Sequence, residues 1–153
     1  MTVSNDGWLK AHFTGSSHMV APTDLTVWRP SSGTWFVRHQ DGSSWQQTWG
    51  VSGDKTLLGD VDGDGVKDLI IWRPSNGLWC VLKSSSNYAT YSVYGWGVNG
   101  DTPLVGDFDG DGKADLAIWR PSNGAWCVLK SSTGYTGYSV YGWGVNGDTP
   151  RVP

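Results

Sequence analysis

The sequence predicts an all-β protein built from repeated four-stranded units, and three observations support this prediction. The chain of 153 residues contains 22 Gly and 7 Pro, a level that breaks helices and favours turns. All 14 acidic residues are Asp and none is Glu, although Glu is the better helix former. The third observation is an internal repeat with a period of 47 residues, which indicates a repeat architecture.

The repeat is clearest in two pairs of nearly identical segments. Residues 72–77 recur at 119–124, and residues 94–103 recur unchanged at 141–150. A divergent earlier copy begins at Trp28 and is three residues shorter between its first and last Trp. Residues 148–152 then restart the pattern of residues 101–105. The chain therefore contains three copies and the start of a fourth.

Each copy is expected to form four short strands. In the last copy these are residues 102–106, 115–119, 125–130 and 138–143, separated by an Asp-Gly loop, by Pro-Ser-Asn-Gly and by Ser-Ser-Thr-Gly. The apolar run of residues 69–72 fits a strand buried between two sheets. Four-stranded units of about 40–50 residues, stacked face to face, describe the blades of a β-propeller.

The predicted organisation has about three blades per chain. Residues 1–23 form a divergent N-terminal segment with a possible first strand, residues 24–55 blade 1, residues 56–102 blade 2, residues 103–147 blade 3, and residues 148–153 the start of a further blade strand. Propellers close with about four to eight blades, so three do not close a ring. Either the chain is a fragment or copies assemble into a ring. Of the assemblies, we expect a homodimer with six blades, a common propeller size.

Nine of the 11 Trp fall into three sets related by the repeat. The first two sets are expected in the core between blades, the commoner place for aromatic side chains. For the third set, core and exposed platform remain equal alternatives. The sets are Trp28, Trp72 and Trp119; Trp35, Trp79 and Trp126; and Trp49, Trp96 and Trp143.

Two nonapeptides, residues 60–68 and 107–115, hold eight of the 14 Asp. Carboxylates so close together repel one another unless a cation lies among them, and ligands that are all oxygen select Ca²⁺. The alternative is a solvated Asp-Gly turn, but two loops with the same spacing favour calcium. We expect two Ca²⁺ per chain, held by Asp60, Asp62, Asp64, Asp68 and the Val66 carbonyl, and by Asp107, Asp109, Asp111, Asp115 and the Lys113 carbonyl. The first copy has Ser16, His18 and Val20 at the corresponding positions, so no calcium is expected there.

The segment GDFDGDGKADLAIWRPSNGAW, residues 106–126, resembles an FG-GAP (VCBS-type) repeat. Such repeats occur in integrin α-chain propellers and in many secreted bacterial proteins. The resemblance implies a calcium loop between the first and second strands of a blade, and a secreted or extracellular location. In place of the family's usual Phe-Gly, this chain has Trp96-Gly97 and Trp143-Gly144. Propellers with similar repeats include lectins, accessory domains of secreted hydrolases and adhesion domains.

The composition favours a binding module over an enzyme. The formal charge is −3, which suits no nucleic acid partner, and no apolar run approaches the roughly 18 residues that span a membrane. No Glu is available for a glycosidase pair, and no nucleophile motif appears. We expect lectin-like sugar binding between blades; the alternative is a structural or protein-adhesion domain without sugar binding. The expected sugar contacts are Arg73, Asn76, Tyr94, Trp96, Arg120, Asn123, Tyr141 and Trp143.

Overall fold

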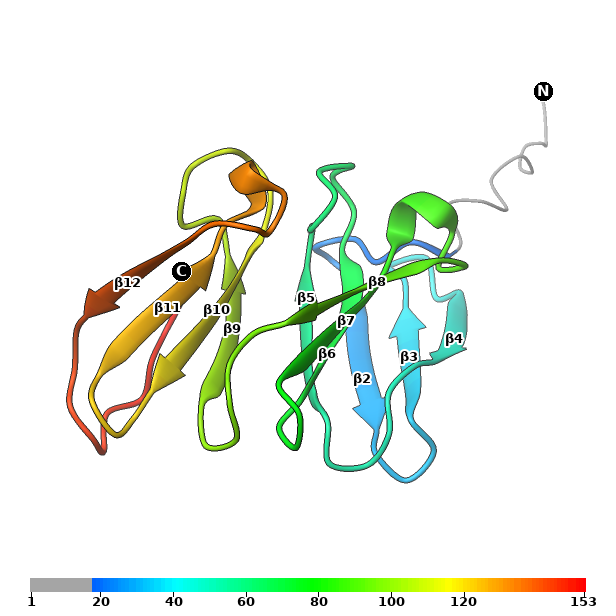
Figure 1. Cartoon of the computed structure of the whole chain (residues 1–153). Coiled ribbons are helices and arrows are strands. Elements are labelled where there is room, and N and C mark those ends of the chain that lie inside the picture. The colour runs from blue at the N-terminus through cyan, green and yellow to red at the C-terminus, as the bar shows by residue number, and fades with distance from the viewer. Residues whose placement is uncertain (1–17) are drawn as a thin grey trace.

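The computed structural model describes residues 18–153, and this part of the chain is all-β (Figure 1). Eleven strands form three antiparallel sheets, and the described residues contain no α-helix. The first sheet consists of β2 (Leu25–Arg29), β3 (Thr34–Arg38) and β4 (Ser44–Thr48). The second consists of β5 (Lys55–Gly59), β6 (Asp68–Arg73), β7 (Leu78–Leu82) and β8 (Tyr91–Gly95), and the third of β9 (Thr102–Gly106), β10 (Asp115–Arg120), β11 (Ala125–Leu129) and β12 (Tyr138–Gly142). No helix in this range is long and apolar enough to cross a membrane.

Each sheet is a meander in which strands consecutive in the chain are neighbours. The predicted four strands are confirmed in the second and third sheets. The first sheet has three described strands; its expected first strand, in residues 1–23, falls almost wholly outside the described residues. Two boundaries differ by one residue. Lys55 pairs with Trp72 in the second sheet, and Thr102 pairs with Trp119 in the third. The pairing register therefore places the blade boundaries before residues 55 and 102.

The three sheets stand side by side in chain order, with their faces packed together (Figure 1). We call the face turned toward the preceding sheet the front face, and the opposite face the back face. The junction between the second and third sheets buries Ile70, Trp72, Trp79 and Val81 from one back face and Leu116, Ile118 and Leu129 from the next front face. The junction between the first and second sheets buries Trp35, Val37 and Trp45 against Leu69, Ile71 and Leu82.

Burial along the second strand of each unit follows from this stacking. Residues 68–72 of β6 are buried without interruption, as expected for a strand covered on both faces. In β10 the same positions are also buried. In β2, by contrast, burial alternates, and Leu25 and Val27 are each 63% exposed. The front face of the first sheet is therefore an exposed apolar surface.

Four members of the first two Trp sets, Trp28, Trp35, Trp72 and Trp79, lie in the sheet junctions, as predicted, and Trp119 and Trp126 lie on the back face of the third sheet. Trp35, Trp72, Trp79 and Trp119 are buried, and Trp28 and Trp126 are half-buried. Their indole N–H groups are satisfied in a repeated way: Trp72 and Trp79 both donate to the Trp96 carbonyl, at 3.0 and 2.9 Å. A buried indole N–H needs such a partner, and one carbonyl here serves two.

The third Trp set is neither a simple core nor a simple platform, because its members reach across to the next sheet. Trp49, which follows the first sheet, donates its indole N–H to the Cys80 carbonyl of β7 at 3.3 Å. Trp96, which follows the second sheet, donates to the Cys127 carbonyl of β11 at 3.1 Å. Trp143 follows the last sheet and is 79% exposed. The set therefore links consecutive sheets wherever a next sheet is present.

Candidate metal centres

The two Asp-rich loops join the first and second strands of the second and third sheets. They lie at the same end of the molecule as two short 3₁₀ turns, η3 (Ser84–Ser86) and η4 (Ser131–Thr133), which follow β7 and β11 (Figure 1). Each loop brings three carboxylates together, with one oxygen from each within 4.8 Å of the others. These groups are Asp60, Asp62 and Asp68, and Asp107, Asp109 and Asp115.

The first Asp of each loop organises the backbone around itself. The Asp60 carboxylate accepts hydrogen bonds from the backbone N–H groups of Gly63, Asp64 and Gly65, at 2.7, 3.1 and 2.8 Å. Both glycines have positive φ angles, 83° and 84°, which only Gly adopts without strain. Asp107 makes the same three bonds in the second loop. The loop is thus wrapped around one carboxylate by the positions of its glycines.

The last Asp of each loop ties the loop to the 3₁₀ turn. Asp68 is fully buried, and its carboxylate accepts bonds from the Val61 N–H and from both the N–H and the hydroxyl of Ser84, each at 2.8 Å. Burial raises the pKa of Asp68 above its ordinary value and the charge of Asp62 adds to this, although the three donors act in the opposite direction. Asp115 is held by the same kinds of donor, including both groups of Ser131.

The middle carboxylate of the first loop offers the clearest indication of a cation. One oxygen of Asp62 accepts a bond from the Ser85 hydroxyl at 2.5 Å, whereas the other oxygen, Oδ1, is buried without a hydrogen-bond partner. A buried carboxylate oxygen that lacks a donor is costly unless a cation neutralises it. Three carboxylates with no nitrogen or sulfur ligand suit a hard cation such as Ca²⁺. The residues of this loop therefore fit calcium.

Four Asp in each loop are predicted to bind the ion. The structure places one of the four, Asp64 or Asp111, outside the three-carboxylate group. The Asp64 oxygens lie 3.1 and 3.0 Å from the Ser84 hydroxyl, and one of them accepts the Val66 N–H at 2.9 Å. Asp111 makes the corresponding contacts with the Ser131 hydroxyl and the Lys113 N–H. Ligand roles for Asp64, Asp111 and the carbonyls of Val66 and Lys113 stay predictions.

Sequence reasoning missed the serines. Ser84 and Ser131 donate to two carboxylates each, those at the fifth and last positions of their loop. The signal was available: Lys-Ser-Ser occurs at residues 83–85 and again at 130–132, at the repeat period. Because these serines lie 16 residues after the last Asp of their loops, only the folded hairpin brings them to the site.

Most of the residues expected to bind sugar are engaged in contacts that hold the fold. Arg73 pairs with Asp54 through two bonds of 2.7 and 2.8 Å, and Arg120 pairs with Asp101 in the same way. Asn76 and Asn123 accept backbone N–H groups within their turns, Tyr94 packs on Tyr135, and Trp96 packs on Tyr138. Tyr141 and Trp143 are exposed. A role in sugar binding for these eight residues stays a prediction.

The Arg73–Asp54 pair makes the stability of the fold depend on pH. Burial raises the pKa of Asp54, but bonds from Arg73 and the Val51 N–H, together with the Arg73 charge, lower it further, so the net pKa lies below its ordinary value. A carboxyl group whose pKa is lower in the folded chain stabilises the fold at pH values above its pKa in the unfolded chain, about 3.9. This stabilisation disappears as pH falls through the pKa of the folded chain. We expect Arg73→Ala to lower the free energy of unfolding by about 2 kcal/mol at neutral pH.

The check is urea unfolding of both proteins in chelator, at neutral pH and at acidic pH. The difference between wild type and Arg73→Ala should shrink below about pH 4, as Asp54 becomes protonated. A difference that stays the same over this range would assign the effect to packing of the Arg73 stem instead of to its charge.

In the first copy, Asp24 stands at the position of the last loop Asp and makes different contacts. Asp24 accepts the Ala21 N–H at 2.8 Å and lies 2.9 Å from the ring nitrogen Nδ1 of His39. Within residues 18–153, the carboxylates gather into three-membered groups only in the two loops of the second and third sheets.

Comparison with known families identifies the loops and strands described above. The sequence model of the FG-GAP-like repeat matches residues 60–118, which include both Asp-rich loops. The model of the FG-GAP repeat matches residues 99–141. Searches of curated proteins and of solved structures returned no match. Together the two family matches span residues 60–141, more than half of the chain, and the protein belongs to the FG-GAP repeat family.

Proposed function

We propose that this chain is a calcium-stabilised β-propeller module with a structural or adhesion role in an extracellular protein. The observation that carries the proposal is the repeated three-carboxylate group, in which a buried Asp joins each loop to the hairpin on the same sheet. FG-GAP repeats are generally structural or binding modules, which supports a role other than catalysis.

Calcium would act here on rigidity. Asp60, Asp62 and Asp68 would hold the ion, and its charge would offset their mutual repulsion and the unpaired Asp62 oxygen. Since Asp68 is bonded to Ser84, fixing this carboxylate also fixes the start of the turn that leads to β8. Two such centres would stiffen one end of two neighbouring sheets.

The structural or adhesion role is favoured over sugar binding by the use of the repeated polar residues. Arg73 and Arg120 each donate two hydrogen bonds to a buried carboxylate, and the Asn76 and Asn123 side-chain oxygens close turns. These contacts give each of the four side chains a structural role without a ligand.

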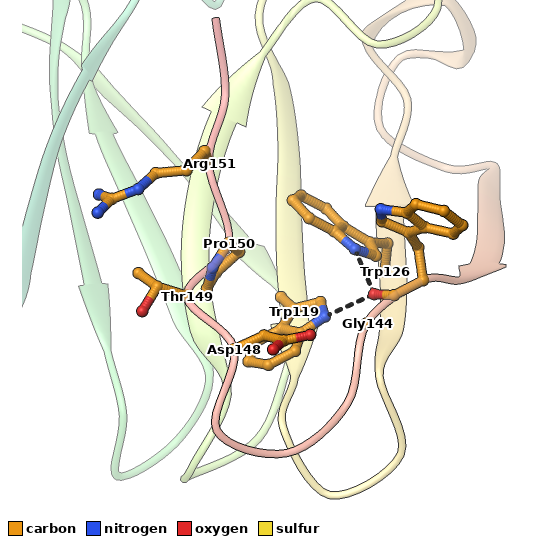
Figure 2. A pocket seen from close by; sticks show the side chains of 8 residues that line it. Trp119, Trp126, Gly144, Asp148, Thr149, Pro150 and Arg151 are labelled. Atoms are coloured by element: carbon orange, nitrogen blue, oxygen red, sulfur yellow. Dashed lines mark hydrogen bonds between the residues drawn. The ribbon is translucent and has the colours of Figure 1, made fainter.

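Sugar binding remains a second candidate because of one feature, the exposed Trp143. It borders a cavity of about 410 Å³ that Asp148 and Arg151 also line (Figure 2). An exposed indole beside charged groups suits the apolar face and the hydroxyls of a pyranose. A glycan array on the calcium-loaded protein separates the two roles. Binding that Trp143→Ala abolishes would favour the lectin role, and no binding would favour the structural one.

The proposed stabilisation by calcium is tested by thermal unfolding. The melting temperature should be higher in millimolar Ca²⁺ than in chelator, because an ion that binds only the folded chain stabilises it by mass action. The same concentration of Mg²⁺ should have a smaller effect, since Mg²⁺ demands a stricter octahedral geometry and loses its water reluctantly. Identical melting curves in Ca²⁺ and in chelator would overturn the proposal.

A further inference from the structure

We infer that two copies of this chain associate head to tail, with the back face of the third sheet of one copy docked on the front face of the first sheet of the other. The inference rests on packing and charge at the two ends of the stack and is independent of calcium. The two internal junctions provide the template for this contact. Each junction shows which groups the back face of one sheet contributes and which groups the front face of the next sheet contributes.

The first part of the template is the bridging Trp. The Trp49 ring lies 5.2 Å from the Tyr91 ring on the next sheet, and the Trp96 ring lies 5.1 Å from that of Tyr138. Both indoles also donate to a carbonyl on the front of that sheet, as described above. Trp143 occupies the same place in the repeat, yet it is 79% exposed. It has the position of a bridging Trp without the sheet that it would bridge to.

The second part is an apolar side chain that fills a hole beside a glycine. A Cβ atom on Gly97 would lie 2.9 Å from Ile118 of the third sheet and 3.4 Å from Trp72. Gly50 receives Ile71 in the same way, again at 2.9 Å. The next sheet can approach this closely only because the residue after each bridging Trp is Gly, which also tolerates the positive φ found there. In each internal junction, an Ile of the next sheet therefore fills the hole beside this Gly.

The hole is also present behind the third sheet, but no side chain of a following sheet fills it. It is a cavity of about 410 Å³ bordered by Trp119, Trp126, Trp143 and Gly144. Figure 2 shows Trp119, Trp126 and Gly144 around it. The indoles of Trp119 and Trp126 both donate to the Trp143 carbonyl, at 3.2 and 3.0 Å, as their counterparts do inside the stack. The hole is thus already shaped before anything enters it.

The complementary surface lies on the front of the first sheet. Val27 pairs with Phe36 in the sheet register, as Ile71 pairs with Cys80 and Ile118 with Cys127. Val27 is therefore the counterpart of the Ile that fills the hole, and the Phe36 carbonyl is the counterpart of the bridging Trp's acceptor. A cavity of about 450 Å³ opens over this surface, and Leu25, Val27 and Phe36 are among the residues that line it.

Charge at the two ends is complementary in the same register. Inside the stack, the Asp that follows each bridging Trp pairs with the Arg at the end of the second strand of the next sheet, as Asp101 does with Arg120. Asp148 is the corresponding Asp at one end; it accepts the Val145 N–H and forms no ion pair within the described chain. Arg29 is the corresponding Arg at the other end. It lies 4.4 Å above the Phe36 ring and has no carboxylate partner among residues 18–153.

The C-terminal residues already lie where the first strand of a next sheet belongs. In the junction between the second and third sheets, Val105 of β9 and Leu57 of β5 both pack against the same buried cluster. Val152, one repeat later, packs on the back face of the third sheet in the cluster that contains Leu104, the counterpart of Leu57. Residues 148–152 repeat residues 101–105 in position and largely in sequence, and β2 has a single neighbour among the described strands. A second copy could place its β2 beside this segment.

A second copy is the occupant that fits, because one chain carries both halves of the contact. The exposed Trp, hole and Asp lie at one end, and the Val, carbonyl and Arg lie at the other. Such a contact is heterologous, and it closes if the rotation between copies allows. Burying two apolar surfaces of this kind supplies the driving force, and the ion pair sets the register.

The test is molar mass by light scattering and sedimentation, in the tens-of-micromolar range, on the whole chain. We expect about twice the chain mass of 16.6 kDa. Trp143→Ala should weaken association at least about tenfold, since buried Trp anchors are among the few residues that carry most of the binding energy of an interface. Val98→Ala is the control, because it shortens an apolar side chain that is 55% exposed at an internal turn. Circular dichroism of the variants should show unchanged strand content.

A charge exchange makes the test specific to the head-to-tail register. Arg29→Asp and Asp148→Arg should each weaken association, because each places like charges opposite one another. The double exchange should recover at least part of it by restoring an opposite pair between copies. A monomer of wild type throughout this concentration range would overturn the inference and leave both faces to neighbouring repeats of a longer chain. A dimer that neither Trp143→Ala nor the single exchanges weaken would also overturn it.

Discussion

The double variant Asp62→Ala plus Asp109→Ala is expected to lose the calcium-induced rise in melting temperature. Each change removes the middle carboxylate of a three-Asp group and leaves no side-chain oxygen there to bind the ion. At a calcium concentration about 100 times the dissociation constant, each site contributes about 2.7 kcal/mol. Two sites then raise the melting temperature by roughly 10–20 °C for a chain of this size. The variant should melt in Ca²⁺ at the temperature of the wild type in chelator.

The calcium-free melting temperature is the internal control of this experiment. It should stay close to the wild-type value, because the Asp62 Oδ1 atom makes no hydrogen bond and the two Asp109 oxygens accept long bonds of 3.3 Å from the N–H groups of Asp111 and Ser132. The matched control is Asp41→Ala, which makes the same chemical change in the β3–β4 hairpin, outside both groups. Asp41→Ala should keep the full response to Ca²⁺. A double variant that still responds like wild type would show that these carboxylates bind no calcium.

Asp68→Ala is expected to lower the free energy of unfolding by at least about 3 kcal/mol, in Ca²⁺ and in chelator alike. The Asp68 carboxylate is fully buried and satisfies three donors, from Val61 and Ser84. Each buried donor left without an acceptor costs about 1–3 kcal/mol. The loss should appear in urea unfolding as a lower midpoint, and Asp115→Ala should behave in the same way in the third sheet. This result would separate the structural role of the last loop Asp from its role toward the ion.

Ser84→Ala serves as the companion variant to Asp68→Ala. It removes only the hydroxyl donor and leaves the backbone N–H of the same residue bonded to Asp68. Its effect in chelator should therefore be smaller, about 1 kcal/mol. An Asp68→Ala protein that is as stable as wild type in chelator would contradict the three bonds as the source of stability.

The strands and loops could be predicted from the sequence because they depend on local patterns. Glycine-rich turns separate short apolar runs at a period of 47 residues, and each Asp-rich loop is contiguous in the chain. The run of residues 69–72 predicts a strand covered on both faces, and the structure confirms it. Ring closure and the number of blades in the ring could not be predicted in this way, because they depend on contacts between copies or with further repeats.

The use of the repeated Arg and Trp could not be predicted from the sequence. Arg73 and Asp54 are 19 residues apart and meet only because β5 pairs with β6 in a particular register. The same holds for Trp96, whose partners lie on the following sheet. Polar and aromatic side chains that repeat with a blade look alike in sequence whether they bind a ligand or join two sheets. Knowledge of register and sheet order is needed to separate these roles.

The most direct test of the central claim is the number of Ca²⁺ ions bound per chain, measured by calorimetric titration of metal-free protein. The account predicts two ions for the wild type, one for Asp62→Ala or Asp109→Ala alone, and none for the double variant. A wild-type protein that binds no Ca²⁺ at millimolar concentration would contradict the account. So would a number of bound ions that these substitutions leave unchanged.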